Sequence, residues 1–275
     1  MVGPEVNLKI SKNLKTRLLS GMCILPIPII AIWNGSWIFV TFVGLLGILL
    51  MCEWDKLIGL CSRKSINYVS PTLVGLSIWL IWSSNIWIAL ICLFGAIFLN
   101  FLTGIRDSCD KILSLWGSIY IFLPCACVIW IREYPGAGLA LMLWLLIVVC
   151  VTDTGAYFFG KILGGPRLAP KISPGKTWAG LFGGIICGSF FGTLFGVFWL
   201  DFPAIPSLWE WGGIAILVAG VAQIGDLGES WLKRKMDVKD SGTIIPGHGG
   251  LLDRLDGFMV SAPVFTSVII LIDLN

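Results

Sequence analysis

Nine long apolar runs constrain the fold of this chain more than any other feature. They fall at 18–33, 36–53, 69–83, 85–102, 114–131, 138–159, 178–200, 211–227 and 258–273. A helix needs roughly 20 residues to cross a bilayer, and most of these runs approach that length. Charged residues make up only 13% of the 275-residue chain, whereas soluble domains carry about 25%. We therefore expect an all-α, polytopic integral membrane bundle of about nine transmembrane helices.

The distribution of basic residues indicates the orientation of these helices. All of the 19 Lys and Arg residues except Arg132 fall in alternate segments, at 1–17, 54–68, 103–113, 160–177 and 228–257. Segments rich in Lys and Arg stay in the cytoplasm. We therefore expect a cytoplasmic N-terminus and an odd number of spans.

The positions of the polar segments also suggest a division of the chain. We expect N-terminal transmembrane helices at 1–135, which contain spans one to five. The region at 136–275 contains spans six to nine and the cytoplasmic loops 160–177 and 228–257, and we expect it to be catalytic.

Charge is concentrated between Asp226 and Asp256, a stretch that holds eleven of the 35 charged residues. Charged side chains beside a membrane span are costly and usually functional. On a helix, Asp226, Glu229 and Ser230 share one face at spacings i, i+3 and i+4. A partner cation or a metal ion would then explain Asp226. The alternative is that Asp226 is a helix-end residue solvated by water.

Two further acids, Asp253 and Asp256, stand three residues apart at the start of the last run. The preceding connection is long enough for Asp253 to meet Asp226 across a helical hairpin. Mg²⁺ usually takes one or two protein carboxylates together with water and substrate phosphates, so this pair predicts a Mg²⁺ site. The alternative is structural, with Arg254 paired to a neighbouring aspartate in a capped helix start.

The same stretch carries groups that suit phosphate binding. His248, the only histidine, stands in a turn with Gly249 and Gly250, and glycines let backbone N–H groups approach an anion. Positive charge in this stretch comes from Lys233, Arg234 and Lys239. The alternative for His248 is a structural hydrogen bond in the turn. A zinc site is not expected, because no cysteine or second histidine accompanies it.

A second group of polar residues begins at Asp153. This residue lies about 10 Å from the cytoplasmic end of its expected helix, at 1.5 Å per residue. Such an acid usually faces a wet cavity or a partner. The next loop offers cations and hydroxyl groups: Lys161, Arg167, Lys171, Ser173, Lys176 and Thr177. A P-loop is excluded, because Pro170 stands where that motif requires glycine and we expect no strand before it. The alternative is that these cations only satisfy the orientation rule.

Spaced residues in the charged stretch form a signature: Ser230, Leu232, Lys233, Arg234, Lys239, Asp240, Gly242, Ile245, Pro246, His248, Gly249, Gly250, Leu251, Asp253, Arg254, Leu255 and Asp256. With D-T-G-A-Y at 153–157 and I-S-P-x-K-T-W at 172–178, it resembles the signature of the CDP-diacylglycerol synthase (phosphatidate cytidylyltransferase) family. The resemblance covers about the C-terminal half. The chain departs from the family at Ala179, where an acid is common, and at Gly257, which is often serine.

The resemblance implies a nucleotidyltransferase of phospholipid biosynthesis that converts CTP and phosphatidate into CDP-diacylglycerol and pyrophosphate. It implies Mg²⁺ at Asp226 and Asp253, with room for a second metal or a monovalent ion. The implied catalytic residues are Asp226, Asp253, Lys233, Arg234, Lys239 and His248. The implied substrate-binding residues are Asp153, Ser173, Lys176, Thr177, Glu229, Ser230, Asp240, Gly249, Gly250, Arg254 and Asp256.

The expected partners are CTP, phosphatidate in the cytoplasmic leaflet and membrane lipids, with no nucleic acid; the family also tends to be dimeric. We expect the protein in a bacterial cytoplasmic (inner) membrane, with its active site facing the cytoplasm. One alternative is another CTP-dependent lipid or polyprenol phosphotransferase. Another is an ion-coupled transporter that uses Asp153 and Asp226. A transporter would place its site at the bilayer centre between repeated halves, whereas this charge lies at one face and no repeat is evident.

Overall fold

The computed structural model describes residues 26–59, 68–106, 110–200, 207–244 and 249–274. Within these ranges the chain forms nine helices: α2 (Pro26–Asn34), α3 (Ser36–Leu57), α4 (Val69–Trp82), α5 (Ile86–Arg106), α6 (Lys111–Arg132), α7 (Gly138–Ile162), α8 (Trp178–Trp199), α9 (Leu208–Lys235) and α10 (Leu252–Asp273). Seven of them, α3 and α5 to α10, are long and apolar enough to cross a membrane. The prediction of an all-α, polytopic membrane protein is thereby confirmed.

Two of the nine predicted spans are shorter in the described part of the chain. Helix α4 has 14 residues, and α2 has nine. The first predicted span began at residue 18, and its portion before Pro26 lies outside the described residues.

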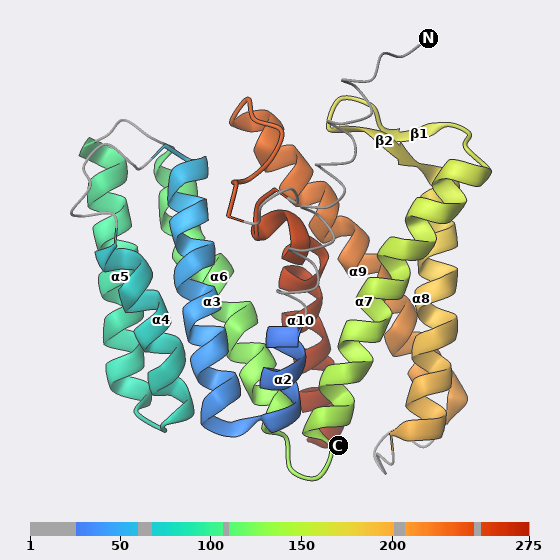
Figure 1. Ribbon diagram of the computed structural model, residues 1–275, viewed down its shortest axis with the longest axis horizontal. Coiled ribbons are helices and arrows are strands. Elements are labelled where there is room, and N and C mark those ends of the chain that lie inside the picture. The colour runs from blue at the N-terminus through green and yellow to red at the C-terminus, as the bar shows by residue number, and fades with distance from the viewer. Residues whose placement is uncertain (1–25, 60–67, 107–109, 201–206, 245–248, 275) are drawn as a thin grey trace, which may run out of the picture.

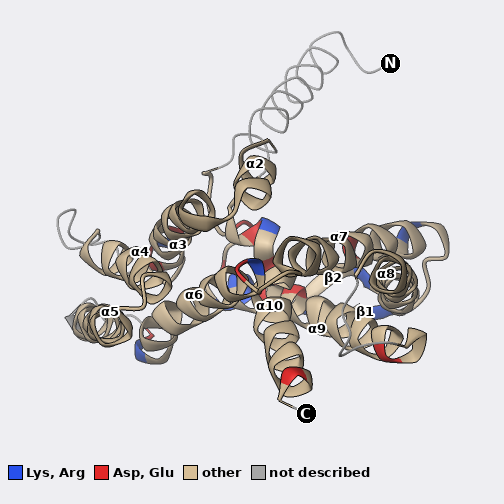
Figure 2. Cartoon of the chain, turned by 90° about the horizontal axis from the view of Figure 1, so that it is seen from below, with Lys and Arg blue, Asp and Glu red and all other residues tan. Residues whose placement is uncertain are grey.

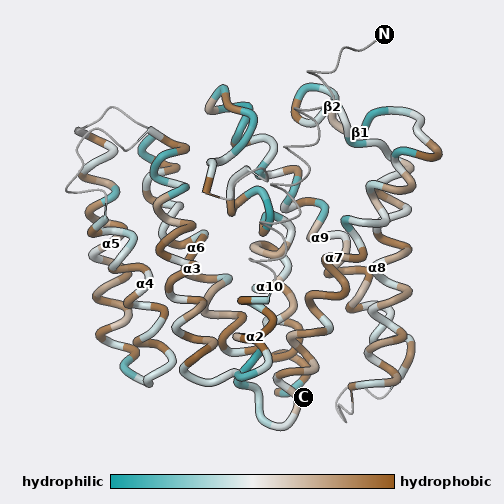
Figure 3. Tube along the Cα trace, viewed as in Figure 1, coloured by the Kyte–Doolittle hydropathy of each residue, from teal (hydrophilic) through white to brown (hydrophobic). Residues whose placement is uncertain are grey.

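The helices run alternately in opposite directions, so the connections lie at the two ends of the bundle (Figure 1). Hydrophilic residues gather at the end that carries the α7–α8 and α9–α10 connections (Figure 3). Viewed along the bundle, charged residues gather around α10, near α6 and α9 (Figure 2). The polar and charged residues that could form a functional site therefore lie at one end of the bundle, above its apolar middle.

Trp144 is the centre of the core of the C-terminal helices. It is fully buried on α7, and its ring stacks on Phe265 of α10 with 4.6 Å between ring centroids. The ring centroid of Trp211, on α9, lies 5.4 Å from that of Trp144. The Trp144 Nε1–H donates to the Gly192 carbonyl of α8 at 2.7 Å. One aromatic side chain thus joins all four helices, and its single polar group is satisfied.

Helix α8 packs against α7 through a face without side chains. The buried residues of α8 are all glycines: Gly180, Gly183, Gly184, Gly188, Gly192 and Gly196. A Cβ atom on Gly184 would lie only 2.7 Å from the Thr152 carbonyl oxygen of α7. Small residues allow membrane helices to approach closely, so this stripe explains how α7 and α8 come together.

Arg132 and Glu133, at the end of α6, cap the hairpin formed by α2 and α3. Arg132 donates from Nε to the Ile32 carbonyl at 2.6 Å and from its NH2 group to the Trp33 carbonyl at 3.1 Å. Glu133 Oε1 accepts from the Ser36 N–H, the first of α3, at 2.8 Å. Helix ends leave such groups without partners inside the helix. Arg132, the one basic residue outside the alternate segments, therefore has a structural role.

The connection from α7 to α8 contains two strands, β1 (Arg167–Ala169) and β2 (Ser173–Thr177), where the sequence predicted a loop without strands. They pair antiparallel, with Arg167 opposite Thr177 and Ala169 opposite Ser173. Arg167 also donates to the Gly175 carbonyl at 3.3 Å. The hairpin gives the backbone of this connection internal partners. Strand β2 leads directly into α8, so the expectation of no strand was wrong, but Pro170 still stands where a P-loop requires glycine and that exclusion rests on it alone.

Candidate active site

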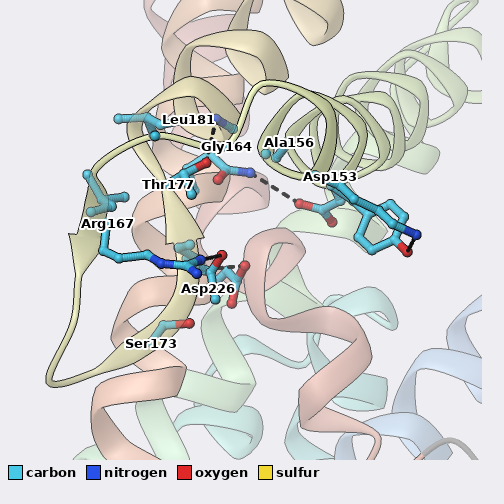
Figure 4. Close-up of a pocket in the computed structure, with 17 residues that line it drawn as sticks. Asp153, Ala156, Gly164, Arg167, Ser173, Thr177, Leu181 and Asp226 are labelled. Atoms are coloured by element: carbon cyan, nitrogen blue, oxygen red, sulfur yellow. Dashed lines mark hydrogen bonds and ion pairs between the residues drawn. The ribbon is translucent and has the colours of Figure 1, made fainter.

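A cavity of about 690 Å³ lies between α7, the β1–β2 hairpin, the start of α8 and the end of α9 (Figure 4). Its size falls within the range of about 300–1,000 Å³ that is usual for small-molecule sites. Polar and charged side chains line it: Asp153, Tyr157, Lys161, Arg167, Ser173, Lys176, Thr177, Gln223 and Asp226. Such a lining suits an anionic ligand that also carries hydrogen-bonding groups.

An ion pair connects the hairpin to α9 inside this cavity. Lys176 Nζ lies 2.7 Å from Asp226 Oδ2, and the two side chains are 18% and 30% exposed. One helical turn before Asp226, Gln223 donates from Nε2 to Asp153 Oδ1 of α7 at 3.4 Å. The two acids thus reach the cavity from different helices, and each has a polar partner.

The hairpin is fixed at both ends, and this fixes the position of Lys176. At one end, Thr177 is the N-cap of α8, and its Oγ1 accepts from the Gly180 N–H at 3.1 Å. Near the turn, Arg234 of α9 donates from Nε to the Ile172 carbonyl at 3.2 Å. Lys176 therefore projects from a supported strand.

Next to the cavity, three carboxylates from α9 and α10 converge. Ligand oxygens of Asp226, Glu229 and Asp256 all lie within 4.8 Å of one another. Mg²⁺ binds oxygens at about 2.0–2.1 Å in an octahedron, which separates neighbouring oxygens by about 3 Å. Small side-chain movements would bring the three onto one ion. Because like charges this close repel each other, the group fits a divalent cation.

Close contact between α9 and α10 makes this convergence possible. A Cβ on Gly225 would lie 2.6 Å from the Asp256 carbonyl oxygen, and a Cβ on Gly257 would lie 3.2 Å from the Ala222 carbonyl oxygen. The two glycines let the backbones approach beside the carboxylates. Gly257, one of the departures from the family signature, thus has a packing role.

Lys233 and Asp253 form a second charged group one turn further along. Lys233 Nζ lies 2.7 Å from Glu229 Oε2 and 2.6 Å from Asp253 Oδ1. The other Asp253 oxygen accepts from the Ser241 and Gly250 N–H groups at 3.0 and 2.9 Å. Asp253 is therefore bonded to three donors, which include both stems of the α9–α10 connection.

This geometry can be set against known proteins. Residues 15–272 match the cytidylyltransferase family. The chain belongs to this family. It is 34% identical to the phosphatidate cytidylyltransferase of Brucella suis biovar 1 (strain 1330) over 260 residues, 91% of each chain. It is 32% identical to the phosphatidate cytidylyltransferase of Staphylococcus aureus (strain COL) over 267 residues, 94% of this chain and 99% of the relative.

In this cytidylyltransferase, the structure brings together many of the residues predicted from sequence. Asp153, Ser173, Lys176, Thr177 and Asp226 line the cavity. The carboxylate group joins Asp226 to Glu229 and Asp256, and Asp253 is not a member of it. The predicted Mg²⁺ pair of Asp226 and Asp253 remains a prediction, because Asp253 interacts with Lys233, Glu229 and the backbone and lies outside the group that Asp226 joins.

The other predicted residues lie around this centre. Arg234 is exposed at the end of α9 and supports the hairpin. Exposed positions are also occupied by Lys239, Asp240 and Arg254, whereas Ser230 is half-buried. Gly249 has φ +88°, a conformation that favours glycine. His248 lies outside the described residues.

Sequence reasoning missed Tyr157 and Gln223, which both line the cavity. Gln223 stands three residues before Asp226, so the helical spacing that grouped Asp226 with Glu229 also places Gln223 on that side. Tyr157 stands four residues after Asp153, which is the same signal on α7. Neither is charged at neutral pH, so a charge in an apolar run, the signal that marks Asp153 and Asp226, does not mark them.

Proposed function

We propose that this protein is a phosphatidate cytidylyltransferase, which transfers the cytidylyl group of CTP to phosphatidate and releases pyrophosphate. The observation that carries the proposal is the junction at Asp226. This residue belongs to a carboxylate group suited to a divalent cation and also lines a cavity of ligand size. A nucleotide triphosphate needs both features side by side.

We assign Mg²⁺ to Asp226, Glu229 and Asp256, and we retain Asp253 as a further candidate ligand. When bound there, Mg²⁺ would neutralise phosphate charge and polarise the phosphorus that is attacked. The acids of this region outnumber its two paired lysines, Lys176 and Lys233, so the site needs added positive charge. A second metal or a monovalent ion fits the same need.

The nucleotide is assigned to the cavity, with its phosphates toward Lys176. Lys176 Nζ stands at the border between the carboxylates and the open volume, where an anionic chain needs positive charge. Arg167 and Lys161 line the same cavity and add cations to it. Fixed cations of this kind stabilise charge that develops on departing pyrophosphate.

Phosphatidate requires no strong general base. The second pKa of a phosphate monoester lies near 6, so its oxygens are already nucleophilic at neutral pH. The residues around the cavity need only exclude water, hold two anions together and direct one oxygen at the α-phosphorus. The lipid would approach from the cytoplasmic leaflet of a bacterial inner membrane. His248, Lys239 and Asp240, in the α9–α10 connection, are assigned to substrate contact there.

The proposal is tested with purified protein in detergent, phosphatidate and CTP labelled at the α-phosphorus, with and without Mg²⁺. We expect labelled CDP-diacylglycerol only when phosphatidate and Mg²⁺ are both present. Asp226→Asn should lose Mg²⁺-dependent turnover and keep its melting temperature. The matched control is Asp237→Asn, because Asp237 is exposed with φ +54°, a conformation that asparagine tolerates. Turnover near the native level in Asp226→Asn would refute the assignment.

A further inference from the structure

Glu53 is an acid of the N-terminal helices that contacts the segment leading to the proposed site. It lies near the end of α3 and is only 1% exposed. A carboxylate buried this deeply in a membrane protein needs hydrogen-bond partners. Its partner comes from the other end of the chain, 199 residues away, at the start of α10.

The carboxylate of Glu53 caps α10. Glu53 Oε2 accepts from the Leu252 N–H at 2.7 Å, and Leu252 is the first residue of α10. The residue in the N-cap position, Leu251, has no side-chain cap hydrogen bond. A side-chain oxygen at a helix N-terminus satisfies a free N–H group and opposes the positive end of the helix dipole. Helix α3 thus supplies the cap that the local sequence lacks.

The same carboxylate contacts two glycines of the α9–α10 connection. At Gly242, the three atoms nearest to an added Cβ all belong to Glu53, with Cδ at 2.7 Å. At Gly250, Glu53 Oε1 would lie 2.6 Å from such a Cβ. Gly242 and Gly250 stand on the two stems of this connection, and Asp253 accepts from the Gly250 N–H. Glu53 therefore touches both stems and the helix that carries Asp253 and Asp256.

We propose that Glu53 is a positioning residue for the active site, which holds the stems of the α9–α10 connection and the first turn of α10. Asp253 and Asp256 are then held on the side of α10 that faces α9. The inference rests on the proposed function, because it assumes that these carboxylates bind the metal ion. It adds a role for the N-terminal helices, none of which lines the cavity in the described part of the chain.

The first experiment compares Glu53→Ala, Glu53→Gln and a control in the full-length protein. Glutamine keeps an acceptor for the Leu252 N–H, whereas alanine removes it. The control is Asp55→Asn: Asp55 is an equally buried acid on α3 whose Oδ1 has no hydrogen-bond partner among the described residues. It tests for a general effect of altering a buried acid on this helix.

We expect Glu53→Ala to raise the Mg²⁺ concentration for half-maximal turnover by about tenfold, the loss of roughly one good hydrogen bond. Glu53→Gln should stay within about threefold of the native value, and Asp55→Asn should match the native protein. Hydrogen exchange should rise in peptides covering 240–257 of Glu53→Ala and stay unchanged in 138–159. An unchanged Mg²⁺ requirement, or Glu53→Gln behaving like Glu53→Ala, would overturn the proposal.

A double-mutant cycle tests the contact without any turnover. Gly242→Ala should lower the melting temperature of the native protein, because the new Cβ collides with Glu53. In the Glu53→Ala background the same change should have less than half that effect, since the obstructing carboxylate is gone. Equal losses in both backgrounds would contradict the contact. If hydrogen exchange and the cycle behave as expected but no variant, nor the native protein, makes CDP-diacylglycerol, the proposed function fails and the structural contact stands.

Discussion

Acids in the N-terminal and C-terminal helices of this protein have different neighbours. In α3, Glu53 accepts a hydrogen bond from the backbone of α10 and packs against two glycines. In α9 and α10, Asp226, Glu229 and Asp256 face one another. A carboxylate that meets N–H groups supports the fold, whereas carboxylates that meet each other require a cation. The neighbours of an acid in a membrane helix, more than how deeply it is buried, therefore indicate whether it has a structural or a catalytic role.

The largest expected effect tests this distinction within α10. Asp256→Asn should lower turnover by about 10²–10³ and leave the melting temperature unchanged, because Asp256 faces other acids and asparagine can still accept from the Gly257 N–H. Asp253→Asn should lower both turnover and melting temperature, since Asp253 bonds to Lys233 and two backbone N–H groups. Activity is measured as turnover of labelled CTP, and stability as the melting temperature in detergent. A stable, inactive Asp253→Asn protein would instead favour Asp253 as a direct metal ligand.

A smaller effect is expected at Lys176, which pairs with Asp226 of the carboxylate group and also lines the cavity. Lys176→Met should lower kcat/KM for CTP by about tenfold to a hundredfold, because it removes the cation beside the phosphates and leaves Asp226 without its pair. Lys171→Met is the matched control, since Lys171 belongs to the same connection and does not line the cavity. Equal losses in the two variants would point to the net charge of the connection.

Helix packing in the C-terminal region provides the next test, which concerns stability. Gly184→Ala should lower the free energy of unfolding by about 1–3 kcal/mol, because its Cβ would meet the Thr152 carbonyl. Gly213→Ala on α9 has no atom within 4 Å of the new Cβ, and we expect it to be neutral or stabilising by up to about 1 kcal/mol. Urea unfolding in mixed micelles compares them. Similar stabilities of the two variants would mean that α7 and α8 are packed less closely than the distance from Gly184 to the Thr152 carbonyl indicates.

The smallest effect concerns an exposed ion pair that joins the two regions. Asp110, the N-cap of α6, pairs with Lys235 at the end of α9. The hydrogen bond from Lys235, with help from the Leu113 N–H, lowers the pKa of Asp110. The resulting stabilisation is complete above the unfolded pKa, near 3.9, and is lost as the pH falls through the lower folded pKa.

Asp110→Asn should therefore lower stability at pH 7 by less than about 1 kcal/mol, and the difference should vanish in more acidic solution. Asparagine is an equally good N-cap, so this variant isolates the ion pair. Lys235→Met should reproduce the pattern. A deficit in Asp110→Asn that persists at acidic pH would show that capping dominates.

Sequence reasoning was most successful where a pattern had a short repeat. Apolar runs near 20 residues predicted the membrane helices, and the i, i+3 spacing placed Asp226 with Glu229 on one face, as the structure confirms. Contacts between distant segments were beyond it. The approach of Asp256 depends on glycines at the α9–α10 crossing, and the role of Glu53 depends on a hydrogen bond across 199 residues. The hairpin at 167–177 was missed because its strands are three and five residues long.

The capping of the α2–α3 hairpin by Arg132 has a consequence for biogenesis. In the proposed orientation this guanidinium must be translocated to the outer side before its two carbonyl acceptors, on Ile32 and Trp33, can bind it. Insertion of the nascent chain is thus opposed by the residue that later secures the folded hairpin. Replacing Arg132 with leucine should ease translocation and remove two hydrogen bonds from the folded hairpin. The amount of protein inserted into the membrane should then rise while its melting temperature falls.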